Sequence, residues 1–102
     1  MQDSLKACLN YDIEADSFTL GGQIKPEGVV EIVEMFLRGQ MGKGADHSEG
    51  NRLSVYHFTI SWTPHEDGIS VRNDCGNKGL RDGILMHFLK HQAEGKVKEI
   101  LP

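Results

Sequence analysis

The stretch Leu53 to Gln92 decides the fold, because an earlier part of the chain repeats its plan. It ends in MHFLKHQ (residues 86–92), and the earlier part ends in EMFLRGQ (residues 34–40). We interpret both as the ends of helices. Each follows two strand-like segments joined by an acidic turn, Glu14-Ala15-Asp16 in the first case and His65-Glu66-Asp67 in the second. The order strand, turn, strand, loop, helix therefore occurs twice and indicates an internal duplication.

Alternation of apolar and polar residues predicts the strands. It is cleanest in the first strand, from Leu5 to Ile13, and recurs over 17–24, 53–62 and 69–72. Helices are predicted from Pro26 to Gln40 and from Leu80 to Gln92, each with one apolar stripe. This ββα-ββα order predicts an α+β two-layer sandwich, in which a four-stranded antiparallel sheet carries two helices on one face.

The predicted domain organisation is a single domain built from two units. The first ββα unit spans residues 5–41, a glycine-rich linker spans 42–52, the second unit spans 53–92, and a tail spans 93–102. A connection of this length is longer than most within a compact domain, so it is either a functional lid or the linker between two repeats. We favour the linker.

Length, composition and charge limit the kinds of protein that this chain can be. A chain of 102 residues with 38% hydrophobic and 25% charged residues has the composition of one folded domain. Its net charge of -4 repels a phosphate backbone, which disfavours nucleic acid as a partner. The chain has neither an apolar stretch of membrane-spanning length nor the pattern of a signal peptide, so we expect a cytoplasmic protein with no membrane association. We expect Cys8 and Cys75 to be free thiols.

Two histidines suggest a metal site. His87 and His91 lie four residues apart on the second predicted helix, which points both imidazoles the same way. The third ligand is left open: His57 is predicted on the opposite face of the sheet, whereas His47 and His65 are predicted in loops from which they could reach the site. The alternative is a pair of ordinary boundary histidines. We interpret the acidic residues of the two turns, Asp16 among them, as solvated.

The connection before the second helix is a candidate anion site. Amides at a helix start attract anions, and two cations lie nearby; the predicted residues are Gly76, Asn77, Lys78, Gly79 and Arg81. No Walker or dinucleotide motif is present, so the alternative is a tight, well-capped connection. Cys75, in the same loop, is a weaker candidate nucleophile, because the neighbouring Asp74 opposes a thiolate.

The sheet face away from the helices is the most informative surface. It carries little charge for a solvent-exposed face, and the residues predicted to contact a partner are Cys8, Leu53, Val55, His57 and Thr59. We therefore predict a non-catalytic interaction or regulatory module that acts as a homodimer without a cofactor. The alternatives are a small-anion or nucleotide-binding protein that uses Cys75–Arg81 and a metal-dependent enzyme that uses His87 and His91.

One short segment of the chain resembles a known family. The stretch from Leu9 to Leu20, with Tyr11-Asp12, Glu14-Ala15-Asp16 and Phe18, resembles the opening of a family of small uncharacterised domains whose first strand reads Tyr-Asp-x-Glu-Ala-Asp. The resemblance covers only about a tenth of the chain, the remainder departs from the family, and the family implies no activity.

Overall fold

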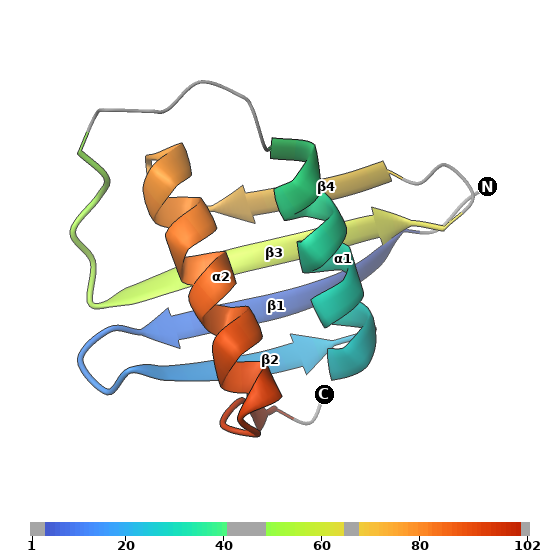
Figure 1. Cartoon of the computed structure of the whole chain (residues 1–102), viewed down its shortest axis with the longest axis horizontal. Coiled ribbons are helices and arrows are strands. Elements are labelled where there is room, and N and C mark those ends of the chain that lie inside the picture. Colours follow the sequence, from blue (N-terminus) through green and yellow to red (C-terminus); the bar gives the residue numbers. More distant parts are fainter. Residues whose placement is uncertain (1–3, 41–48, 65–67, 101–102) are drawn as a thin grey trace.

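The computed structural model describes residues 4–40, 49–64 and 68–100. Its elements are β1 (Leu5–Asp12), β2 (Ser17–Gly22), α1 (Pro26–Gln40), β3 (Val55–Thr63), β4 (Gly68–Asn73), α2 (Lys78–Ala93) and β5 (Lys98–Glu99). Both helices lie on the same face of the sheet, as Figure 1 shows. The predicted α+β class is confirmed, and so is the placement of both helices on one side.

The sheet differs from the predicted one in having a fifth strand. Its order is β4-β3-β1-β2-β5. Strands β1 to β4 pair antiparallel with their neighbours, whereas β5 pairs parallel with β2. The prediction of a four-stranded antiparallel sheet is therefore wrong in detail, because the sheet is mixed. The internal duplication stays a prediction.

Chain reversal after α2 explains the extra strand. Gly95 adopts a positive φ of 71°, and the Lys96 amide donates to the His91 carbonyl oxygen at 2.9 Å. The tail then runs beside β2, where the Ile100 amide donates to the Leu20 carbonyl oxygen at 2.8 Å. This pairing covers an edge that would otherwise expose unpaired backbone groups. A strand of two charged residues has no alternation of apolar and polar residues, so this pattern could not predict β5.

The core lies between the sheet and the two helices. Residues of β1 alternate as predicted: Ala7 and Leu9 are buried, and Cys8 is exposed on the other face. The largest fully buried side chains are Phe18, Phe58, Phe88, Leu9, Ile60, Leu85, Val29, Val33 and Cys75. The buried residues of α1, which are Val29, Ile32 and Val33, lie on one side of the helix, as a single apolar stripe requires.

Element boundaries differ where side chains bond to the backbone. Helix α2 starts at Lys78 rather than Leu80, because the Asn77 side chain caps it by accepting a hydrogen bond from the Leu80 amide at 2.8 Å. Strand β3 starts at Val55 rather than Leu53. Just before it, the Tyr56 hydroxyl donates to the Asn51 carbonyl oxygen at 2.6 Å and accepts from the Leu53 amide at 3.2 Å.

Some predictions fall outside the described residues. Met41, residues 42–48 of the predicted linker, and both His47 and His65 belong to this group. Neither helix among the described residues has the length and hydropathy that a membrane span requires.

Candidate functional site

A cluster of three polar side chains forms where the β1–β2 turn meets α2. Asp16 comes from the turn, and His87 and His91 come from successive turns of α2. His87 Nε2 lies 2.6 Å from Asp16 Oδ1, and His91 Nε2 lies 3.5 Å from Asp16 Oδ2. The fold thus brings together residues 71 positions apart in the sequence.

The Asp16 carboxylate is held by the backbone of its turn and by hydrogen bonds from Tyr11 and His87. Its backbone has a positive φ of 49°, and the Tyr11 hydroxyl donates to its Oδ1 at 2.7 Å. Hydrogen bonds from Tyr11 and then His87 lower the pKa of Asp16 to about 2. Burial and the nearby carboxylate raise the pKa of Tyr11 to about 12. The carboxylate therefore stays ionised, and Tyr11 stays protonated, across the physiological range.

Aromatic rings orient the two histidines. The Phe18 ring lies 5.7 Å from the His87 ring and 5.1 Å from the His91 ring, and it stacks on Tyr11 at 4.4 Å. The two imidazoles lie 4.3 Å apart, nearly edge to face. His91 is only 5% exposed, and its Nδ1 has no hydrogen-bond partner among the described residues. An arrangement of this kind presents imidazole nitrogens and a carboxylate oxygen to one point.

Sequence reasoning found two members of this cluster and missed the third. His87 and His91 were paired correctly by their helical spacing. Asp16 was interpreted as a solvated turn residue, and nothing in local spacing connects it to α2. The alternation of β1 and β2 does place their turn at one end of the sheet, but the crossing of α2 over that end is a property of the tertiary fold.

His57 lies on the opposite face of the sheet, as predicted. Its backbone amide donates to Asp74 Oδ1, and its Nδ1 lies 2.9 Å from Asp74 Oδ2. Burial alone raises the pKa of Asp74, but these contacts with His57 outweigh it and lower the pKa. His57 therefore belongs to a separate, exposed pair and does not join the Asp16 cluster.

The predicted anion loop surrounds a hollow of about 340 Å³, which is lined by Asn73, Gly76, Asn77, Lys78 and Arg81. Arg81 is only partly engaged. Its Nε lies 2.8 Å from Asp82 Oδ1 and its guanidinium lies 4.8 Å from the centre of the Phe36 ring, whereas its buried Nη2 has no hydrogen-bond partner among the described residues. Gly79 lies within α2 rather than in the loop. Anion binding here stays a prediction.

Cys75 has the character of a core residue. Its side chain is fully buried, and burial together with Asp74 raises the pKa of its thiol to about 11. A thiol with this pKa is almost wholly protonated at neutral pH, which argues against a nucleophilic role.

The uncovered side of the sheet is here called the open face, defined by Lys6, Cys8, Asn10, Asp12, Ser17, Thr19, Val55, His57, Thr59, Ser61, Ser70 and Arg72. Cross-strand pairing places Cys8 beside Thr59, and Asp12 beside Val55. Leu53 precedes β3 and so lies outside the sheet, contrary to its predicted position on this face. A hollow of about 290 Å³ on the open face is lined by Asn10, Asp12, Ser17, Thr19, Val55 and His57.

Comparisons with known proteins find no relative. No family model, curated protein or solved structure matches this chain. The resemblance of residues 9–20 to a family of small domains gains no support from them, and the function has to be argued from geometry.

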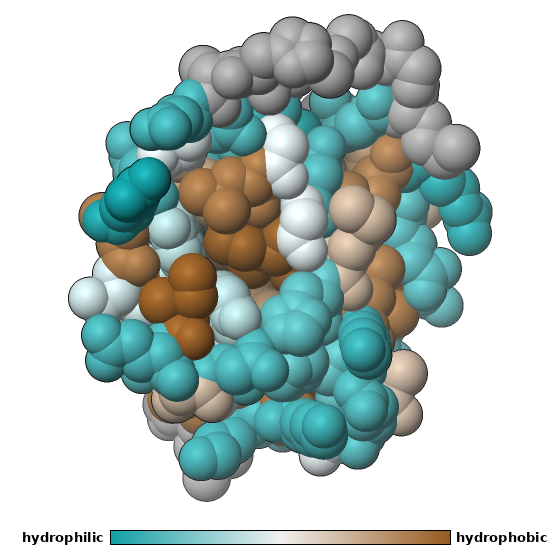
Figure 2. Space-filling model, turned by 60° about the vertical axis from the view of Figure 1, so that its left-hand side comes forward, coloured by the Kyte–Doolittle hydropathy of each residue, from teal (hydrophilic) through white to brown (hydrophobic). Residues whose placement is uncertain are grey.

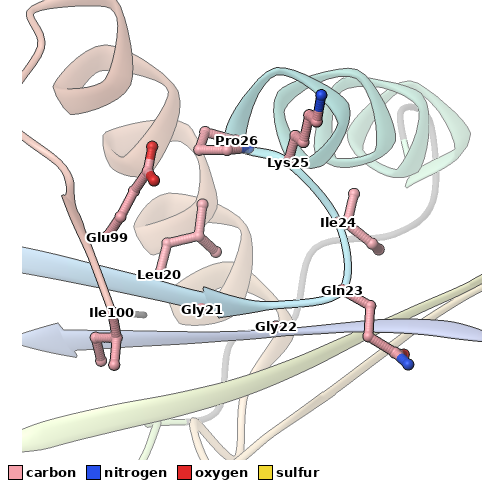
Figure 3. A pocket seen from close by; sticks show the side chains of 9 residues that line it. All are labelled: Leu20, Gly21, Gly22, Gln23, Ile24, Lys25, Pro26, Glu99 and Ile100. Carbon is pink, nitrogen blue, oxygen red and sulfur yellow. The ribbon is translucent and has the colours of Figure 1, made fainter. Parts of the chain in front are cut away.

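Two further surface features lie outside the Asp16 cluster and the open face. Figure 3 shows a pocket of about 170 Å³ between the end of β2, the start of α1 and the tail. Its charged lining residues, Lys25 and Glu99, are exposed, so it does not define a ligand class. Figure 2 shows apolar residues gathered at the end of the molecule that carries the β1–β2 turn. Ile13 and Leu53 are exposed at this end of the sheet.

Proposed function

We propose that this protein is a non-catalytic interaction module that forms a homodimer through its open face. Helices α1 and α2 cover only the other side of the sheet, which leaves the open face to solvent in a single chain (Figure 1). Two-fold homodimers are the commonest oligomers of soluble proteins, and a second copy related by such an axis would cover this face. The proposal includes a cytoplasmic location, where the unpaired Cys8 and Cys75 stay reduced.

The observation that carries the proposal is the self-complementary charge of β1. Lys6 lies near its start and Asp12 at its end, and both belong to the open face. A two-fold axis parallel to the sheet and perpendicular to the strands lays β1 antiparallel over its own copy. With the axis over Leu9, Lys6 of each chain faces Asp12 of the other.

The surface around Asp12 suits this pairing. The hollow on the open face has Asp12 in its wall, with polar groups from Asn10 and Thr19 beside it. A lysine stem from the second copy has room there, and its ammonium reaches a carboxylate. Symmetry makes the contact twice, so each dimer gains two such pairs. Opposite charges across an interface chiefly fix register and partner choice.

Sedimentation equilibrium tests this proposal with a matched pair of variants. The unaltered chain is expected at twice the mass of one chain. Lys6→Glu places like charges together at two symmetric contacts and is expected to weaken dimerisation by at least about tenfold, equivalent to about 1.4 kcal/mol. Lys25→Glu makes the same charge change outside the open face and is expected to leave the mass unchanged. A monomeric parent, or a Lys6→Glu variant as dimeric as the parent, contradicts the proposal.

A further inference from the structure

A second binding function is carried by the cluster at the other side of the sheet and does not depend on the dimer. We propose that Asp16, His87 and His91 form a site for one divalent transition-metal ion of the zinc class. Two imidazole nitrogens and one carboxylate oxygen are a recurrent set of protein ligands for such ions.

The distances suit a single ion. One ligand atom from each residue can be chosen so that all three lie within 4.8 Å of one another. Neighbouring ligand atoms in a tetrahedral zinc site lie roughly 3.4 Å apart, given bonds of about 2.0–2.1 Å. His91 Nε2 and Asp16 Oδ2 already stand at 3.5 Å. His87 Nε2 and Asp16 Oδ1, at 2.6 Å, need to separate by less than an ångström.

The ligands are positioned by the fold rather than by chance at a mobile surface. The two histidines are fixed by α2 and by packing on Phe18. Asp16 is fixed by its turn and by the Tyr11 hydroxyl, which is the kind of outer hydrogen bond that orients metal-binding carboxylates.

Burial of His91 keeps its imidazole turned toward the cluster. The side chain is nine-tenths buried or more, its Nε2 points toward Asp16, and its Nδ1 has no partner in the part of the chain that the structure describes. Burying an imidazole with so few hydrogen bonds costs stability. A metal ion at Nε2 would give this buried ring a stronger partner than Asp16 Oδ2 at 3.5 Å, and it leaves Nδ1 as it is.

The donor set also selects among ions. Calcium and magnesium prefer oxygen ligands throughout, so they fit a site with two imidazoles poorly. Neither cysteine contributes sulfur, since Cys75 is in the core and Cys8 is on the open face. The Asp16 side chain is 55% exposed, so a fourth position opens to solvent and is available to water or an external ligand.

The test is metal binding by the full chain, measured by calorimetry with Zn²⁺ and by visible absorption with Co²⁺. One ion per chain is expected, with the strong absorption of tetrahedral cobalt. His87→Ala and Asp16→Asn are each expected to weaken binding by more than the roughly 10–100-fold cost of losing an outer-shell partner. His57→Ala removes a histidine from the opposite face and is expected to bind like the parent. Circular dichroism checks that each variant is folded.

Three outcomes overturn the proposal. One is the absence of saturable binding by the parent at micromolar metal. Another is binding of several ions per chain without tetrahedral cobalt absorption, which indicates adventitious binding. The third is a His57→Ala variant that loses as much affinity as His87→Ala. Tyr11→Phe separates positioning from ligation, because it is expected to cost only about tenfold in affinity.

Discussion

At the residue scale, Asp16 connects the structural and the functional sides of the molecule. Its carboxylate accepts from the buried Tyr11 and contacts His87 on another element. The same oxygen atoms therefore tie the β1–β2 turn to α2 and present a negative charge to two imidazoles. A short sequence window could identify Asp16 only as a turn residue, because its partner histidines follow far along the chain.

The lowered pKa of Asp16 predicts a pH dependence of stability. Its folded value of about 2 lies below the ordinary value of 3.8, so the folded state favours the carboxylate. The resulting stabilisation is fully present above 3.8 and disappears as the pH falls through about 2. Asp16→Asn lacks this ionisation. The difference in unfolding free energy between parent and variant is therefore expected to be constant just above pH 3.8 and to shrink below it.

Urea titrations at a series of pH values, with a chelator present, measure this difference. The chelator separates the intrinsic role of the carboxylate from any effect of bound metal. A difference that persists unchanged down to pH 2 contradicts the role assigned to the Tyr11 and His87 hydrogen bonds.

At the element scale, periodicity predicted the helices and the four long strands because each of these elements buries one face. Leu9 on β1 and Leu85 on α2 are buried as their spacing indicates. The boundaries depended instead on side chains that bond to backbone, such as Asn77 at the start of α2. Strand β5 depended on a partner edge, which no local pattern reveals.

The close approach of Gly22, at the end of β2, to the backbone of β1 provides a prediction about packing. Gly22 has a φ of 121°, and a Cβ atom there would lie 2.6 Å from the Lys6 carbonyl oxygen. Gly22→Ala is therefore expected to lower the free energy of unfolding by more than about 1 kcal/mol. In contrast, a Cβ at Gly83 of α2 meets nothing within 4 Å, so Gly83→Ala is expected to raise it by about 0.5–1 kcal/mol. Thermal or urea unfolding of both variants decides, and a neutral Gly22→Ala refutes the close approach of β1.

At the scale of the whole molecule, the two sides of the sheet differ. Two helices cover one side of a five-stranded sheet, and the other side is polar, weakly charged and hollowed beside Asp12. The sequence predicted this asymmetry because the residues between the core positions of β1 and β3 are mostly small and polar. It also predicted the histidine pair of α2, but only the tertiary fold brings Asp16 to it.

The most direct measurement of the central claim is thiol cross-linking between two copies of β1. In the antiparallel alignment set by Lys6 and Asp12, Cys8 of one chain faces Asn10 of the other. Stacked sheets lie about 10 Å apart, which is too far for a disulfide between facing residues. Asn10→Cys is therefore expected to yield a covalent dimer with a bismaleimide cross-linker short enough to join only facing thiols, visible as doubled mass under denaturing conditions. The Cys8→Ser, Asn10→Cys double variant removes the facing thiol and is expected to keep the mass of one chain in the same denaturing assay. An Asn10→Cys variant that forms no covalent dimer, or a double variant that forms one equally well, contradicts the antiparallel pairing of open faces.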